Sequence, residues 1–538
     1  IACALSMKTA RPVRLALTRE EEFTTVKCRH NFDITLETSA TAQGKLLRRD
    51  AGMTVDNGAY NHSGPSVMAY AGQVLGSLYR IPAVNVDAEL VYTNKQPGGQ
   101  FRGYGGPQAI FALESQMDEL ADQLGMDPVE LRILNANKEG DTTLTGWRLD
   151  SARLVECLET ARDLIGWQGR SAKAADGRGI GFAAAIHVSG ANIYEGADKS
   201  SATVEVDSDG RVLLRFGAAD AGTWQNTVVA QFVAQELGIE PHEVQLITMD
   251  TEETPTELGS WSSRGTYMSG HSVGQTARDV AEALRLHGAT ILESPVDEVW
   301  LDAGSVTNGV NSVSFGTVVV EQLGGSLTRT REITLTNVDA VNRETGIANL
   351  SGAYSFAVHA VEVSVDEGTG KVKVERYVAV HDSGKVVNPI AARSQVIGGV
   401  AMGIGYALSE ELLYEDGQSM TRSYIQYPLP RAADLPEIEV VFIEGEDPHG
   451  PYGAKAIGEI VLIPPGAAIA NAVADATGTR IRELPLTPDR LLASLGERDS
   501  RPKRNYRILL RPSRWQIAVV RAWYPRGLHR LLHRFGTK

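Results

Sequence analysis

Hydrophobic and polar residues alternate along several short stretches of the chain, as they do in β-strands with one buried face. Such strands are predicted at residues 13–17, 32–38, 211–216, 243–249, 371–380 and 436–444. Helical spacing of apolar residues, capping residues or runs of small residues predict helices at 107–124, 128–134, 227–237 and 398–413. Because strands and helices are interspersed along the chain, the pattern predicts a mixed α+β fold.

Turn and capping residues define the ends of some of these elements. Pro107 lies in the first turn of one predicted helix and Gly125 follows its end. Asp127 is placed to cap the next helix, and the triplet 56–58, Asp-Asn-Gly, predicts a turn.

Length and charge restrict the class of protein. With 538 residues the chain is expected to form two to four domains. Its net charge of −14 disfavours nucleic-acid binding, because an acidic surface repels the phosphate backbone. No apolar run approaches the roughly 18 residues of a membrane-spanning helix, so no membrane span is expected.

The last 38 residues differ from the rest, since they contain eleven Lys or Arg and no Asp or Glu. Leucines and tryptophans lie among the arginines between residues 504 and 535, which predicts basic amphipathic helices. Two interpretations stay open, a solvated appendage and a docking arm. For an arm, an acidic protein partner is favoured over an anionic membrane surface.

The three cysteines, Cys3, Cys28 and Cys157, are widely spaced and form no Cys-x-x-Cys motif. This excludes a disulfide framework and an iron–sulfur or structural zinc site made by this chain alone. A cytoplasmic location is expected. The chain begins with Ile rather than Met, and its start is expected to be the middle of a longer protein.

Five glycine-rich or polar loops, at 100–108, 217–227, 259–270, 382–405 and 450–459, each join a predicted strand to a helix. Cofactor sites commonly form at such places. The first loop combines free amides at a helix start with the permanent cation of Arg102, and the third offers hydroxyls and an arginine suited to phosphate. The alternative for each loop is a capped turn or close helix packing.

Glu459, at the end of the fifth loop, is the candidate general base. The fifteen residues that follow it carry no charge, so it is expected at the edge of a dry interior. The alternative is a solvated loop glutamate. The chain has no His-Glu-x-x-His, P-loop or Gly-x-Ser-x-Gly motif. We expect four scattered histidines to be core or surface residues rather than ligands: His62, His187, His359 and His381.

In this order the loops resemble the molybdopterin-binding large subunit of the xanthine oxidase family of molybdenum hydroxylases. The matching motifs are Phe101-Arg-Gly-Tyr-Gly-Gly-Pro-Gln108, Asp382-x-Gly-x-x-x-Asn-Pro389 and Gly453-Ala-Lys-x-x-Gly-Glu459, within a resemblance that covers about residues 10 to 497. The segment Ile186-His-Val-Ser-Gly190 is similar to the branch that contains 4-hydroxybenzoyl-CoA reductase.

The resemblance implies two elongated mixed α/β domains with the cofactor between them. They would be residues 1–167, as an N-terminally incomplete first molybdopterin-binding domain, and residues 168–497, as the second. Residues 498–538 would form the basic helical tail.

The resemblance also implies the roles of individual residues. Glu459 would be the catalytic base, and Arg102 would orient substrate or stabilise developing negative charge. The pterin dithiolene would hold molybdenum, with no direct protein ligand. Thr223 replaces the glutamine usual in the family at this point. The cofactor-binding residues would be Phe101, Gly103, Gly222, Thr223, Ser262, Ser263, Arg264, Gln395 and Gly458.

The implied activity is oxidation of an electron-poor carbon of an aromatic, heteroaromatic or aldehyde substrate, with water as the oxygen source. The cofactor would be molybdopterin, in its cytosine dinucleotide form, with Mo. Electrons would pass to iron–sulfur and FAD partner subunits or domains in a higher oligomer, completed by the missing N-terminal molybdopterin-binding segment. Two alternatives stay open: reductive dehydroxylation of an aromatic CoA thioester, and a non-catalytic assembly or interaction module.

Overall fold

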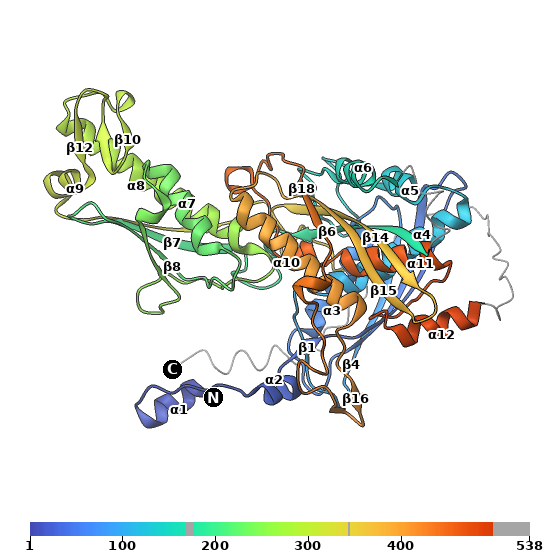
Figure 1. Cartoon of the computed structure of the whole chain (residues 1–538). Coiled ribbons are helices and arrows are strands. Elements are labelled where there is room, and N and C mark those ends of the chain that lie inside the picture. Colours follow the sequence, from blue (N-terminus) through green and yellow to red (C-terminus); the bar gives the residue numbers. More distant parts are fainter. Residues whose placement is uncertain (168–176, 343–344, 499–538) are drawn as a thin grey trace.

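The structure is a computed structural model that describes residues 1–167, 177–342 and 345–498 (Figure 1). Its α-helices are α1 (Ala2–Thr9), α2 (Arg19–Thr25), α3 (Gly64–Ser77), α4 (Gly106–Leu124), α5 (Pro128–Asn135), α6 (Leu154–Ile165), α7 (Gln225–Leu237), α8 (Gly270–Ile291), α9 (Phe315–Leu323), α10 (Pro389–Leu408), α11 (Pro465–Thr477) and α12 (Pro488–Arg498). The fold is mixed α and β, as the sequence pattern predicts.

Three sheets form the framework. The first has the order β2 (Phe32–Ala40), β3 (Leu46–Asp56), β4 (Val84–Val91). The second has the order β18 (Ile438–Phe442), β15 (Lys371–Asp382), β14 (Tyr354–Asp366), β6 (Arg178–Val188). The third has the order β13 (Leu327–Thr334), β7 (Lys199–Val206), β8 (Val212–Phe216), β9 (Val244–Thr248). Each sheet combines antiparallel and parallel pairs.

The short strands form smaller sheets at the periphery. The strands β10 (Trp300–Asp302), β11 (Ser305–Thr307) and β12 (Ser312–Ser314) make an antiparallel sheet beside α8 and α9. Two further pairs are β1 (Cys28–Arg29) with β5 (Gly98–Gly99), and β16 (Tyr414–Glu415) with β17 (Gln418–Ser419).

Two large hydrophobic cores hold these elements. The larger core joins apolar side chains from the first half of the chain to those of β6, β14, β15, α10 and α11. The second core contains residues between 202 and 327, and Figure 1 shows this part extending away from the rest. The larger core takes residues from both sides of the predicted boundary at 167, and the division into domains stays a prediction.

Most predicted elements are present, with one exception and one shift. Residues 13–17 form no strand; they run without a strand partner between α1 and α2, and most of their side chains are exposed. The helix predicted at 398–413 instead begins at Pro389 and ends at Leu408. Its start follows from capping, since Asn388 accepts a hydrogen bond from the Ala391 amide.

The segment Ile460–Thr477 is long and apolar enough to cross a membrane, which the sequence pattern did not predict. However, 89% of it is buried inside the protein, as in a core helix. Glycines on β6 let it approach closely, because a Cβ at Gly181 would lie 2.1 Å from the Ala472 amide nitrogen of α11. The small residues of α11 are thus explained by helix–sheet packing.

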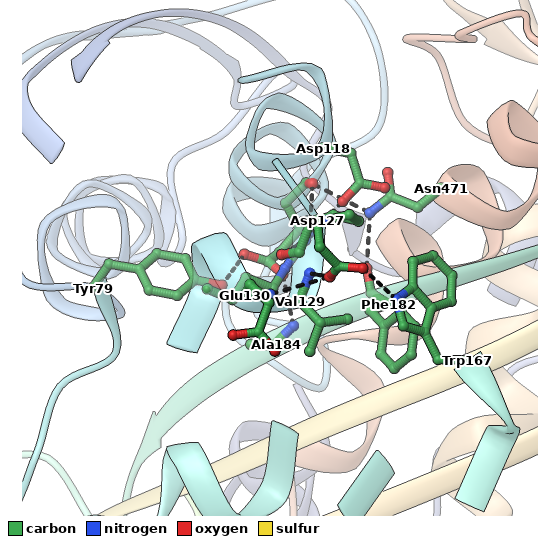
Figure 2. A network of polar contacts seen from close by, with 12 residues as sticks. Tyr79, Asp118, Asp127, Val129, Glu130, Trp167, Phe182, Ala184 and Asn471 are labelled. Carbon is green, nitrogen blue, oxygen red and sulfur yellow. Dashed lines mark hydrogen bonds and ion pairs between the residues drawn. The ribbon is translucent and has the colours of Figure 1, made fainter. Parts of the chain in front are cut away.

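A buried polar network joins α4, α5, β6 and α11 (Figure 2). Glu114 on α4 accepts hydrogen bonds from Arg132 on α5 at 2.8 Å, from the Ala184 amide of β6 at 2.7 Å and from Tyr79 at 2.6 Å. Asn471 of α11 donates to the Glu114 carbonyl at 3.2 Å. Because several donors bind the Glu114 carboxylate, its burial is tolerated. The network fixes α4, α5 and α11 against β6 of the second sheet.

Candidate functional site

Four of the five predicted loops meet around Arg102, which lies just before α4. Its Nε donates to the Gly458 carbonyl at 2.7 Å, and one Nη donates to Gln395 Oε1 at 3.1 Å. Gln395, on α10, donates in turn to the Gly222 carbonyl at 3.0 Å. Loops that are hundreds of residues apart in sequence are therefore joined by one chain of hydrogen bonds.

Glu459 lies at the centre of this group. Ser263 Oγ donates to Glu459 Oε2 at 3.4 Å and accepts from the Glu459 amide at 3.1 Å. The side chain is 19% exposed, so it is neither solvated nor fully enclosed. Its placement at the edge of the interior agrees with the expectation for a candidate base, although its catalytic role stays a prediction.

The strongest contact of Glu459 is with His187, near the end of β6. His187 Nε2 lies 2.6 Å from Glu459 Oε2, and the imidazole is almost completely buried. His187 Nδ1 lies 2.6 Å from the hydroxyl of Tyr70 on α3. The expectation that His187 is merely a core or surface residue is thus incomplete, because it is buried and also contacts the candidate base.

Strands β6 and β14 also hold the backbone of the fifth loop. Ser189, directly after β6, accepts a hydrogen bond from the Ala456 amide at 3.0 Å, and Ser355 on β14 donates to the Ala456 carbonyl. The same two strands thus place His187 and fix the segment that carries Glu459.

A buried ion pair anchors the start of that loop. Lys455 Nζ lies 2.7 Å from Asp382 Oδ2, and both side chains are fully enclosed. The Lys455 amide also donates to the Ser383 carbonyl at 2.8 Å. The two motifs that begin at Asp382 and Gly453 therefore bind each other, so Asp382 and Lys455 act on the site through its framework.

The third predicted loop, residues 259–270, is called the serine loop below and has a constrained backbone. Ser262 and Ser263 have φ values of 51° and 53°, which L-residues adopt at a cost. The Ser262 carbonyl accepts from the Gly190 amide at 2.8 Å, next to β6. This conformation directs Ser263 to Glu459.

Arg264 differs from a typical phosphate-binding arginine. Its guanidinium is buried and pairs with Glu257 at 2.9 Å, and it donates to the Lys199 carbonyl. In the described structure it holds the serine loop in place. Its Nε and Nη1 are buried without a hydrogen-bond partner among the described residues, and direct binding of a ligand by Arg264 stays a prediction.

The other predicted residues occupy the edges of the group. Gly103 has a φ of +91°, and a Cβ there would lie 2.7 Å from the Pro107 ring. Phe101 is half-exposed and stacks under the Arg29 guanidinium at 4.3 Å. The amides of Gly222 and Thr223 both donate to Asp220 Oδ1 at 2.9 Å, which shapes the turn before α7.

A cavity of about 1130 Å³ lies beside Phe101, between the first sheet and the segment that follows α10. Its wall contains aromatic rings, together with Arg29 and Gln108. Arg29 Nη1 and Gln108 Oε1 are buried without hydrogen-bond partners. No group of three or more His, Cys, Asp or Glu suited to hold a metal ion occurs in the part of the chain that the structure describes.

Comparisons with known proteins agree on one family. Residues 160–436 and residues 1–136 match molybdopterin cofactor-binding domains. The chain is 34% identical over 499 residues to the xanthine dehydrogenase molybdenum-binding subunit of Escherichia coli O157:H7, which covers 89% of this chain and 64% of that protein. It is 32% identical over 508 residues to the 6-hydroxypseudooxynicotine dehydrogenase complex subunit gamma of Paenarthrobacter nicotinovorans, covering 90% and 62%.

Solved structures give the same result. Quinoline 2-oxidoreductase from Pseudomonas putida 86 matches with a TM-score of 0.83 at 26% identity, covering 92% of this chain and 66% of that chain. Aldehyde oxidoreductase from Desulfovibrio gigas matches with a TM-score of 0.81 at 27% identity, covering 91% and 52%. The chain spans less than two thirds of the length of the two curated relatives above.

Proposed function

Because the chain belongs to the molybdopterin cofactor-binding family of molybdenum-binding subunits, we propose that it forms the catalytic part of a molybdenum hydroxylase. The reaction would oxidise an electron-poor carbon of an aromatic, heteroaromatic or aldehyde substrate, with water as the oxygen source. One observation carries the proposal: hydrogen bonds join Gly458, Arg102, Gln395 and Gly222 into a single site, directly beside Glu459.

The residues around this site suit a pterin that bears phosphate. The backbone at Gly222 has a φ of +85°, and a Cβ there would meet nothing within 4 Å, so this turn is open. The Asp220 carboxylate already accepts from the Gly222, Thr223 and Asn226 amides, as expected for an anion at the start of a helix. Ser263 donates to Glu459, so the Ser262 hydroxyl is the one left to donate to a ligand. Asn226 Oδ1 is buried without a partner, as expected where a ligand completes the hydrogen bonding.

Molybdopterin supplies the redox chemistry when it is bound, and the residues of the chain supply the proton transfer and the orientation. Glu459 Oε2 carries the contacts to His187 and Ser263, which leaves Oε1 to accept a proton during the reaction. Burial lowers the pKa of Arg102 while the charge of Glu459 raises it, and a guanidinium stays protonated in this balance. Its remaining Nη group is available to a substrate oxygen.

Further components are part of the proposal. The two curated relatives described above are named as a molybdenum-binding subunit and as a subunit of a dehydrogenase complex. We infer iron–sulfur and FAD partners, a higher oligomer and the cytosine dinucleotide form of the cofactor. The remaining molybdopterin-binding segment and a cytoplasmic location belong to the same proposal. The predicted docking arm at 498–538 lies almost wholly outside the described residues.

The experiment is Glu459→Gln in the assembled enzyme, with molybdenum content measured on each preparation. Loss of a general base should lower turnover about 10²- to 10⁴-fold while molybdenum content stays normal. Glu415→Gln, at an exposed position in β16, is the matched control and should keep full turnover. Full turnover of a molybdenum-loaded Glu459→Gln enzyme would refute the assignment, and an assembled complex without molybdenum would support a non-catalytic module.

A further inference from the structure

The Glu459 carboxylate is bound asymmetrically. His187 Nε2 and Ser263 Oγ both contact Oε2, at 2.6 and 3.4 Å. Oε1 has no hydrogen bond to any of the described residues. One oxygen is therefore held by the protein, and the other is left to exchange a proton.

Hydrogen bonding around Tyr70 fixes which nitrogen of His187 carries the proton. The Tyr70 side chain is buried, so its hydroxyl hydrogen needs an acceptor inside the protein. His187 Nδ1, 2.6 Å away, is the acceptor that the structure provides. Because Nδ1 accepts, the ring hydrogen of neutral His187 is on Nε2, where it points at Glu459.

The opposite arrangement is unfavourable. If His187 carried hydrogens on both nitrogens, its Nδ1–H would donate to Tyr70, and the buried hydroxyl hydrogen would have no partner. Burial also raises the pKa of Tyr70 well above its usual value, so the hydroxyl keeps its hydrogen. Trp147 stacks on the Tyr70 ring, with 6.0 Å between ring centroids, and holds it in this orientation.

We propose that Tyr70 and His187 form a positioning relay that keeps one N–H donor on Glu459 Oε2 and thereby reserves Oε1 for proton transfer. Tyr70 acts only through His187, and His187 acts only through Glu459. The inference rests on the proposed function, because it takes Glu459 as the base.

Several titratable or charged groups face Glu459. His187 comes from β6, Tyr70 from α3, Arg29 from β1 and Arg102 from the loop before α4. Burial lowers the pKa of both arginines, and the negative charge of Glu459 opposes this lowering. The relay differs from the two arginines because it contributes a directed hydrogen bond rather than a charge. It is therefore tested by removing the His187 donor while both arginines stay unchanged.

The test compares His187→Phe, which removes the donor and keeps a ring, with His187→Gln, which keeps an N–H donor. Tyr70→Phe keeps the ring packing and removes only the hydroxyl. The readout is the infrared band of a protonated carboxylic acid that appears as the full chain is acidified. Its assignment to Glu459 comes from its absence in Glu459→Gln.

The band should appear at a pH about one unit higher in His187→Phe than in the wild type, because a hydrogen bond to the ionised carboxylate is lost. Tyr70→Phe should shift it in the same direction by less, and His187→Gln should restore most of the wild-type midpoint. In the loaded enzyme, the acidic limb of the kcat/KM profile should move in the same order.

An unchanged band midpoint in His187→Phe would overturn the relay, and if that variant does not fold, an unchanged midpoint in Tyr70→Phe would do so. A variant that lost only thermal stability or molybdenum would indicate a purely structural role and would also overturn it. The infrared measurement needs no turnover, so it stands if the proposed hydroxylase activity is not found. Conversely, if Glu459→Gln is inactive but the band midpoint does not shift in His187→Phe, the proposed function is supported and the relay is refuted.

Discussion

The ion pair between Lys455 and Asp382 predicts a large loss of stability when one partner is removed. The pair is fully enclosed, with 2.7 Å between Lys455 Nζ and Asp382 Oδ2. In Lys455→Met, Asp382 would keep two backbone donors, the Arg153 amide at 3.0 Å and the Gly384 amide at 3.4 Å. Neither neutral amide replaces the lost positive charge, so a buried carboxylate would be left without its counter-ion.

Breaking a buried pair in this way costs about 3–5 kcal/mol of the free energy of unfolding. Asp382→Asn combined with Lys455→Met removes both charges and keeps one oxygen that can accept from one of the two amides. The double variant should therefore be less destabilised than the sum of the single variants. Urea unfolding followed by tryptophan fluorescence measures all three, with Arg431→Ala in an exposed ion pair as a control that should change little.

Two results would refute this reasoning. A Lys455→Met chain that unfolds within about 1 kcal/mol of the wild type would show that the pair is not an important anchor. Additive losses in the double variant would show that the two charges do not depend on each other. With coupling observed, turnover of the loaded enzyme should also fall in Lys455→Met, because Glu459 is four residues further along the same loop.

Two further predictions concern stability. Burial lowers the pKa of His381 to about 3. As the pH falls, the unfolded chain therefore takes up a proton at His381 before the folded chain does. The contribution of neutral His381 to the free energy of unfolding is complete above about pH 6.5 and is lost toward pH 3, at about 1.4 kcal/mol per pH unit. His381→Gln should flatten the pH dependence of the urea midpoint over this range, and equal slopes would contradict the assignment. Gly181→Ala should lower the thermal midpoint strongly, because its Cβ would lie 2.1 Å from the Ala472 amide; Gly125→Ala, which meets no neighbour but has a φ of +63°, should cost less. Equal losses in the two glycine variants would contradict this packing argument.

Elements with strong local signals could be predicted from the sequence. Helix α4 ends at Leu124 before Gly125 in the left-handed conformation, and Asp127 caps α5 through the Val129 amide. Strand β14 was not predicted: both faces of its first half are buried and show no regular alternation, although its last six residues, Val361 to Asp366, do alternate. The strand predicted at 13–17 is absent although its local pattern favours one, because a strand also needs a partner strand and the local pattern does not supply it.

The candidate site shows the same division between local and long-range information. Glu459 could be singled out because the residues after it are apolar, and Arg102 because it precedes a helix with glycines. His187 and Tyr70 could not, since they lie 272 and 389 residues from Glu459 and meet it only through the fold. The available signal was a single histidine within the small apolar side chains of β6.

The contacts of the site link two parts of the chain with separate cores. Gly222 and Ser263 lie in loops attached to the second core, whereas Arg102 and His187 belong to elements of the larger core. Glu459 receives contacts from both, through Ser263 on one side and His187 on the other. The orientation of the carboxylate therefore depends on how the two parts are placed relative to each other. A ligand that binds between them would stabilise that placement, so cofactor binding and the positioning of the base are expected to be coupled.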